Sequence, residues 1–385
     1  MDNFQYSEEF IKDAKEFSDS CIDCGACTKN CEMLRSFNIN PKSFFSTEEG
    51  KINTDAVIPY SCSMCGMCSK VCPKGLKLES LFFSMRKEHI KNNKGKSPMK
   101  GHNAIEMHQS FGFSKLFTTS VTDTDAGFTK RAFIPGCSLS SYNPELVGKT
   151  LNFLQLSLPG TGAVLKCCGQ PTLLLGQEDK FHKRYESLQS EIDRLHAEEV
   201  ITACQNCFTT ISKFSPKQKV KSLWTVIKEL GLPDELKGKG KDSDITFALH
   251  DPCPTRYNSD IQEAVRWIIE ELGYKVKETA FSRENTRCCG FGGMAVPANP
   301  ELTKKIMKEN AREIEEDYVI TYCASCREAM TIGGKKSLHI LDLMFNDVYY
   351  RTSKIPGLKR NFLENWTARY KSKKVIKNCK LYKKM

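Results

Sequence analysis

The chain has 385 residues, enough for two to four domains with buried cores, and its 19 cysteines far exceed ordinary usage. The N-terminus shows no signal peptide, and no apolar run approaches the ~18 residues that a membrane span needs. We therefore expect a cytoplasmic protein whose thiols bind metal rather than form disulfides. The net charge of +11 arises after residue 350, where twelve basic residues accompany one acid, so nucleic-acid binding by the neutral body is not indicated.

Two cysteine motifs follow a predicted amphipathic helix at residues 7–18, for which Ser7 is a suitable N-cap. Each motif has the spacing CxxCxxCxxxC, which is typical of paired [4Fe–4S] ferredoxin sites in which the fourth ligand comes from the other motif. The predicted ligand sets are Cys21, Cys24, Cys27 and Cys72 for one cluster, and Cys62, Cys65, Cys68 and Cys31 for the other. Zinc is the weaker alternative, because its sites usually show two separated CxxC pairs. We assign residues 1–100 to a helical ferredoxin-like domain.

Residues 101–130 are predicted to be a linker with local helical content. Beyond it, two stretches, 131–236 and 244–350, alternate short apolar strands with helices, which predicts α/β units with mostly parallel sheets. The expected strands are 131–135, 162–166, 200–203, 245–249, 275–279 and 318–322, and the expected helices are 144–154, 178–199, 261–272 and 301–316. A Gly/Lys-rich segment at 237–241 separates the two stretches.

One arrangement of cysteines occurs in both stretches. Each copy has a single cysteine, a CCG triplet and a CxxC, and equivalent cysteines are 116, 121 and 119 residues apart. The sequence ITACQNC at 201–207 also matches ITYCASC at 320–326. We call the copies frame 1, which is Cys137, Cys167, Cys168, Cys204 and Cys207, and frame 2, which is Cys253, Cys288, Cys289, Cys323 and Cys326. The pattern predicts an internal duplication with its ligands at the carboxyl ends of strands.

Adjacent cysteines suit an extended iron–sulfur cluster better than a single ion, because neighbouring side chains diverge in an extended backbone. Gly169 and Gly290 follow the two pairs, and we expect their missing Cβ atoms to let the backbone pass close to inorganic sulfide. The alternative for each frame is a zinc-binding or buried-thiol scaffold.

Both frames resemble the cysteine-rich CCG domains of heterodisulfide reductase. The whole chain from about Ser20 to Asp347 is similar to the D subunit of that enzyme, or equally to a fusion of its C and B subunits; HDPC at 250–253, CGFGG at 289–293 and HILDL at 339–343 support this. The resemblance implies a mixed fold, with a helical ferredoxin-like domain followed by two tandem α/β CCG domains. It also implies a noncubane [4Fe–4S] cluster in each frame, with Cys168 and Cys289 as bridging ligands.

The leading functional hypothesis is reductive cleavage of a disulfide, either CoM–S–S–CoB or an analogue, between the two frames. The reaction takes two electrons whereas clusters deliver one at a time, so two clusters facing one substrate suit it. His250 is the candidate proton carrier, with Asp251 to orient it, or else it is simply packed beneath the site. Arg256 and Arg287 flank frame 2 and either bind an anionic substrate or tune a cluster potential.

Two other functions stay open. The first is an electron-transfer subunit, similar to those of anaerobic glycerol-3-phosphate dehydrogenase or glycolate oxidase, that serves a flavoprotein and passes electrons toward quinone. The second is a zinc-stabilised interaction scaffold. No phosphate-cradling glycine loop follows a strand, so we expect no flavin or nucleotide on this chain. Electrons must then come from a partner, which is a flavoprotein subunit, a b-type cytochrome or a ferredoxin.

Residues 351–385 form a basic tail. Leu358, Phe362, Trp366 and Tyr370 recur every four residues among lysines and arginines. We expect either a basic amphipathic helix that lies on a partner or on the inner face of a membrane, or a solvated extension. Cys379 belongs to neither frame and is predicted to be an incidental thiol.

Overall fold

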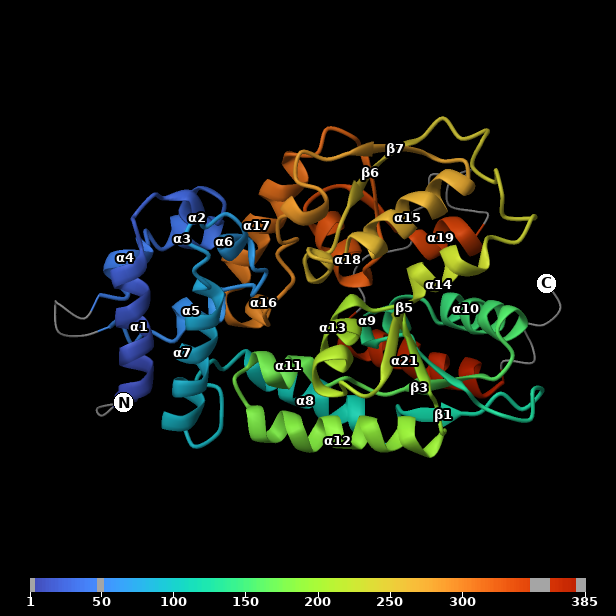
Figure 1. Cartoon of the computed structure of the whole chain (residues 1–385), viewed down its shortest axis with the longest axis horizontal. Coiled ribbons are helices and arrows are strands. Elements are labelled where there is room, and N and C mark those ends of the chain that lie inside the picture. Colours follow the sequence, from blue (N-terminus) through green and yellow to red (C-terminus); the bar gives the residue numbers. More distant parts are fainter. Residues whose placement is uncertain (1–3, 47–51, 347–360, 379–385) are drawn as a thin grey trace.

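The computed structural model describes residues 4–46, 52–346 and 361–378, so Leu358 and Cys379 lie outside the described residues. The N-terminal domain is helical (Figure 1). Its first helix, α1 (Glu8–Ser20), begins as predicted at Ser7, whose hydroxyl accepts a hydrogen bond from the Phe10 N–H. The remaining helices are α2 (Ala26–Lys29), α3 (Glu32–Ser36), α4 (Pro41–Phe44), α5 (Val57–Ser61), α6 (Met67–Lys70) and α7 (Leu78–Asn92).

The first α/β domain contains a five-stranded sheet in the order β1-β3-β2-β4-β5, parallel except for β1. Its strands are β1 (Thr119–Val121), β2 (Arg131–Ile134), β3 (Thr161–Leu165), β4 (Glu199–Thr202) and β5 (Lys219–Ser222). Its helices are α8 (His102–Phe113), α9 (Cys137–Tyr142), α10 (Pro144–Ser157), α11 (Gln170–Leu174), α12 (Glu178–Arg194), α13 (Gln205–Phe214) and α14 (Leu223–Leu230).

The second α/β domain repeats this topology in a parallel sheet of order β7-β6-β8-β9. Its strands are β6 (Thr246–His250), β7 (Lys275–Glu278), β8 (Tyr318–Thr321) and β9 (Lys336–His339). Its helices are η1 (Cys253–Thr255), α15 (Ser259–Glu271), η2 (Arg283–Asn285), α16 (Ala295–Ala298), α17 (Pro300–Arg312), α18 (Ala324–Ile332) and α19 (Ile340–Phe345). Strands β2 to β5 correspond one by one to β6 to β9, which establishes the duplication at the level of topology.

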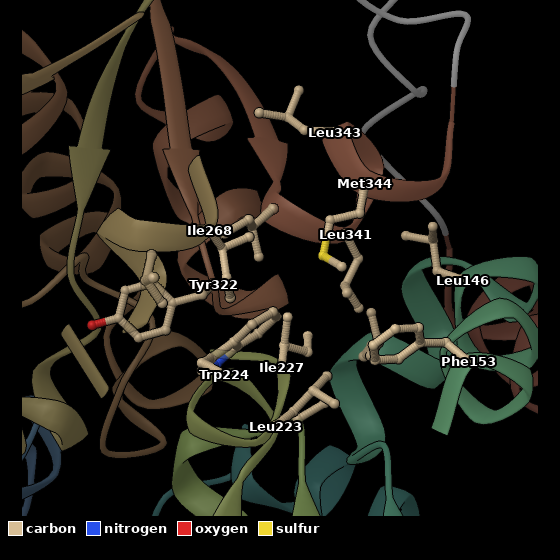
Figure 2. Close-up of a cluster of buried hydrophobic side chains, with 14 of the residues drawn as sticks. Leu146, Phe153, Leu223, Trp224, Ile227, Ile268, Tyr322, Leu341, Leu343 and Met344 are labelled. Carbon is tan, nitrogen blue, oxygen red and sulfur yellow. The ribbon is translucent and has the colours of Figure 1, made fainter. Parts of the chain in front are cut away.

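The two α/β domains pack together through one apolar core. Helix α14 packs on α15, and its Trp224 is fully buried near Tyr322 (Figure 2). Helix α10 packs on α19 in the same way. Because α10 is equivalent to α15 and α14 to α19, these are the same contact made twice, as in an isologous dimer. The helices that carry the cysteines make a second pair of equivalent contacts: α9 packs on α18, and η1 packs on α13. The two frames therefore face one another across a pseudo-two-fold axis.

One predicted boundary is wrong. Residues 101–130 are not a linker, because α8 packs on α11 and β1 joins the first sheet beside β3. The tail helix, α21 (Phe362–Lys377), exists but returns to the first α/β domain and packs on α9, α10 and β1. Trp366 is 4% exposed and lies against the rings of Phe111 and Phe117. Trp366, one of the apolar side chains predicted to face a membrane or a partner, is thus buried within the protein itself.

Within the described ranges, every helix falls short of the length and hydropathy that crossing a lipid bilayer demands.

Candidate metal centres

Frame 1 forms at the carboxyl ends of three neighbouring strands. Cys137 follows β2, the pair Cys167–Cys168 follows β3, and Cys204 follows β4. Gly136 lets these loops meet, because it has a φ of 81° and a Cβ at this position would lie 2.4 Å from the Cβ of Cys204. Within the frame, four pairs of thiols lie within hydrogen-bonding reach: Cys137 with Cys167, Cys167 with Cys168, Cys168 with Cys207, and Cys204 with Cys207.

Frame 2 repeats this arrangement pair by pair. The equivalent thiols within reach of one another are Cys253 with Cys288, Cys288 with Cys289, Cys289 with Cys326, and Cys323 with Cys326. The structure therefore gathers the ten cysteines of the CCG and CxxC motifs into two groups of five.

The environment of the thiols fits an iron–sulfur cluster. Six of them are buried: Cys167, Cys168, Cys207, Cys288, Cys289 and Cys326. A hydrogen bond with Cys167 and burial raise the pKa of Cys137 well above its usual value, and a hydrogen bond with Cys288 and burial do the same for Cys253. Several thiolates in such a place require a positive metal centre, since buried charges need compensation. Thiolate ligands select soft metals and iron–sulfur clusters.

Gly169 and Gly290 have a steric role that was not predicted from the sequence. Both have left-handed backbones, with φ of 78° and 96°. A Cβ at Gly169 would lie 3.1 Å from the ring of Phe181, and one at Gly290 would lie 2.8 Å from Cγ of Met307. The missing Cβ atoms therefore make room for α12 and α17.

His250 lies at the end of β6, directly beside frame 2. One of its ring nitrogens and the sulfurs of Cys289 and Cys326 all lie within 4.8 Å of one another. Its Nε2 has no hydrogen-bond partner in the part of the chain that the structure describes, and burial lowers its pKa. His250 also lines a shallow pocket together with Arg287 and Asn310. Frame 1 has Ile134 at the equivalent position.

Asp251 does not orient His250. Its carboxylate accepts hydrogen bonds from Arg266 Nη2 at 2.8 Å, from the backbone N–H of Arg283 at 2.7 Å and from the Tyr322 hydroxyl at 2.8 Å. The prediction that this carboxylate holds the imidazole is wrong, because its oxygens are occupied by these other donors.

The ferredoxin-type cysteines form two neighbouring groups. Cys21, Cys24, Cys27 and Cys72, the predicted ligands of one cluster, line a single cavity, which Cys68 of the other set lines as well. In the other set, Cys31, Cys62 and Cys68 lie close enough to influence one another electrostatically. Cys65 lies within hydrogen-bonding reach of Cys288, which belongs to frame 2. The second ferredoxin-type site thus borders frame 2.

A close backbone contact explains how these two sites meet. Gly293 has a φ of 64°, and a Cβ there would lie 2.3 Å from the carbonyl oxygen of Cys62; at Gly292 it would lie 2.7 Å from that of Ser63. The two glycines that follow the second CCG triplet thus admit the second ferredoxin motif.

Arginines secure this interface. Arg256 is 3% exposed and donates to the carbonyl oxygens of Cys65 and Thr286, at 3.2 and 2.7 Å, so it is not free to bind a substrate. Arg287 stacks on Phe281 and pairs with Glu313 at the pocket.

The structural role of Arg86, in α7, was not predicted from the sequence. It is fully buried and donates to four carbonyl oxygens from all three domains, those of Pro59, Cys62, Leu174 and Gly293. Burial lowers its pKa to about 10. The available signal was a charged residue among the apolar residues Phe82, Met85 and Ile90, which recur at helical spacing.

Comparison with known proteins identifies both kinds of domain. The 4Fe-4S dicluster domain family matches residues 17–76, and the CCG cysteine-rich domain family matches residues 131–212 and 247–331. No solved structure matches the chain.

Similar curated proteins cover most of the chain. One is the D subunit of dihydromethanophenazine:CoB–CoM heterodisulfide reductase from Methanosarcina mazei, 23% identical over 89% of this chain and 94% of that protein. Another is the B subunit of fumarate reductase (CoM/CoB) from Methanothermobacter marburgensis, 24% identical over 87% and 73%. An uncharacterized iron–sulfur protein from Methanococcus maripaludis is 26% identical over 89% and 75%.

Proposed function

Because the chain belongs with the iron–sulfur proteins that join a 4Fe-4S dicluster domain to two CCG domains, we propose that it is the disulfide-reducing subunit of an oxidoreductase complex similar to heterodisulfide reductase. One observation carries the proposal: both frames are complete, and they face each other across the pseudo-two-fold axis. An electron-relay role alone does not require two complete and opposed frames.

The proposed metal sites are four. The ferredoxin-type cysteines hold two [4Fe–4S] clusters in the ligand sets given above, and each frame holds one noncubane cluster, with Cys168 and Cys289 as bridging ligands. When bound, such clusters supply electrons one at a time, and the cleavage of a disulfide to two thiols consumes two electrons and two protons.

The positions of the four sites suggest the order in which electrons pass through them. Cys24 of the first ferredoxin-type site is exposed, which suits contact with a partner that donates electrons. The second site lies against frame 2 through Cys65 and Cys288, and frame 2 faces frame 1 through α9 and α18. The partner is a flavoprotein subunit, a b-type cytochrome or a ferredoxin. His250 is the proposed proton carrier, because it is the imidazole that lies between frame 2 and the surface pocket.

A second candidate is an electron-transfer subunit of a flavoprotein dehydrogenase. The observation that favours it is the relative from Methanothermobacter marburgensis, whose name assigns it to a fumarate reductase (CoM/CoB). On this proposal a partner carries out the chemistry and this chain passes electrons on.

Anaerobic iron and sulfide quantitation, followed by EPR with added CoM–S–S–CoB, other small disulfides and thiols, separates the candidates. About sixteen irons, as four four-iron clusters require, with a signal that depends on the disulfide or thiol, supports the reductase. About eight irons, zinc in the frames and no such signal overturns it. The Cys289→Ser variant is expected to lose the signal, whereas the matched Cys379→Ser variant keeps it.

A further inference from the structure

The two frames are duplicated, but their surroundings are not. Frame 2 faces the ferredoxin-like domain, whereas frame 1 is covered by α8 and α21, which have no equivalents among the described residues of the second α/β domain. From α8, Gln109 Nε2 donates to the Cys167 sulfur at 3.4 Å, and Gly112 passes so close that a Cβ would lie 3.2 Å from the Cβ of Cys167. The chain thus adds two non-duplicated elements to frame 1.

From α21, Arg369 enters this covered region. It is 1% exposed, its guanidinium lies 5.7 Å from the ring of Trp366, and none of its three nitrogens makes a hydrogen bond of normal geometry with the residues that the structure describes. No carboxylate pairs with it in those same ranges. A buried, unpaired guanidinium is costly, so it requires an anion that the protein side chains around it do not provide.

The position of Arg369 identifies that anion. Ser372, one turn later on the same face of α21, donates to the carbonyl oxygen of Ser140 at 2.8 Å, three residues after Cys137. Helix α21 packs on α9, the helix that begins at Cys137, and the Arg369 guanidinium lies within hydrogen-bonding reach of the Cys137 thiol. Arg369 therefore lies at frame 1, next to a thiol that becomes a thiolate when it binds metal.

The duplication shows what Arg369 replaces. Cys137 and Cys253 are equivalent, so Ser140 of frame 1 corresponds to Arg256 of frame 2. Arg256 is buried directly after η1, the short helix that begins at Cys253, and its backbone N–H donates to the Cys253 carbonyl oxygen. Frame 2 thus has an arginine, Arg256, in its own loop. Frame 1 has Ser140 at that position, and its arginine comes from α21, which is hydrogen-bonded to Ser140 through Ser372.

We propose that Arg369 supplies the counter-charge for the metal centre held by frame 1, in the role that Arg256 has at frame 2. The inference rests on the proposed function, since it needs a cluster in frame 1. A positive charge beside a centre favours its reduced, more negative form, so Arg369 raises the reduction potential of that centre. The C-terminal helix is then part of the redox site.

The test is an anaerobic EPR-monitored redox titration of the full chain. We expect Arg369→Gln to make reduction of the frame 1 centre at least about tenfold less favourable, a shift of about 59 mV for a one-electron couple, with iron content unchanged. Arg369→Lys is expected to keep most of the wild-type potential. Lys371→Gln, which removes the same charge from an exposed position on the same helix, is the matched control and should cause no shift. The signal that disappears in Cys207→Ser identifies frame 1.

A full complement of iron in Arg369→Gln without a shift overturns the inference. If Arg369→Gln instead loses about four irons, Arg369→Lys decides: retained iron supports the need for the charge, and loss in both variants shows that shape alone matters. A wild-type protein with no iron in frame 1 refutes the proposed function itself, which is a separate outcome.

Discussion

The hydroxyl groups of Ser138 and Ser325 share a hydrogen bond of 2.8 Å. Ser138 follows Cys137 of frame 1, and Ser325 precedes Cys326 of frame 2. Two serine side chains therefore connect ligand loops from opposite halves of a duplicated chain. Metal centres held by these loops are near neighbours, whichever of the two proposed functions applies.

We expect this proximity to appear as a magnetic interaction. In fully reduced protein, the EPR spectrum of the frame 2 centre should be broadened or split by the paramagnetic centre in frame 1. Cys207→Ser removes a frame 1 ligand and should return the frame 2 spectrum to that of an isolated centre, whereas Cys379→Ser should leave it broadened. A frame 2 signal that is identical in Cys207→Ser and in the wild type would contradict the arrangement.

Gly293 provides a test of the contact between the ferredoxin-like domain and frame 2. Gly293→Ala places a Cβ on the carbonyl oxygen of Cys62, so the second ferredoxin motif must move away. We expect all clusters to be retained while the frame clusters are reduced much more slowly, at least about tenfold, after rapid reduction of the ferredoxin-type clusters. Stopped-flow absorbance measures both phases.

The control for this variant is Gly127→Ala. Gly127 has a similar φ of 74° with open space where the Cβ would go, so it carries the same backbone strain without the clash. Equal slowing in both variants would show that strain, rather than the domain contact, governs the rate.

Arg86 should contribute strongly to stability. Arg86→Met leaves the carbonyl oxygens of Pro59, Cys62, Leu174 and Gly293 without this donor, and we expect a loss of about 3–5 kcal/mol in the free energy of unfolding. Urea titration followed by cluster absorbance measures it. The neighbouring Lys87→Gln, which removes a surface ion pair with Glu178, should change the free energy by less than about 1 kcal/mol. Similar effects in both variants would refute this role.

Asp342 should make stability depend on pH. It accepts hydrogen bonds from the Tyr142 hydroxyl and the His339 N–H, and burial raises its pKa to about 6. The folded state therefore holds a proton that the unfolded state releases near its ordinary, lower pKa. The stabilising contribution is fully present below that lower pKa and is lost as pH rises through about 6.

Between pH 5 and 7.5 the wild type should thus lose about 1–2 kcal/mol that Asp342→Asn does not lose. Urea midpoints across this range measure the difference, and acid lability of the clusters affects both proteins alike. Parallel pH profiles for the two proteins would show that Asp342 does not titrate in this range.

The sequence predicted most of the two α/β domains because their central strands are short apolar runs between amphipathic helices. Strands β1, β5 and β9 were missed because they are short edge strands without an apolar run. Edge strand β7 (KVKE) has no apolar run either, but it was predicted because the duplication assigns a strand to its position. Helix α8 was assigned to a linker because its buried positions include His102, Gln109 and Gly112, which form no apolar stripe. Helix α21 was predicted, but its local sequence does not specify whether its apolar side chains pack on this protein, on a partner or on a membrane.

The same limit applies to the sites. Motif spacing predicted which cysteines belong together, since each group is fixed by loops at known strand ends. The equivalence of Ser140 and Arg256 was readable in the duplication, but the approach of Arg369 was not, because it depends on a contact between residues more than two hundred positions apart.

The return of α21 also determines when the protein is complete. During synthesis the first α/β domain emerges before the second, yet the helix that covers frame 1 is translated after both. The cysteines of frame 1 are thus synthesised before those of frame 2, but the helix that covers frame 1 is synthesised last of these elements. Frame 1 is enclosed only after α21 has been synthesised, so removal of α21 would open a site in the N-terminal half of the duplication.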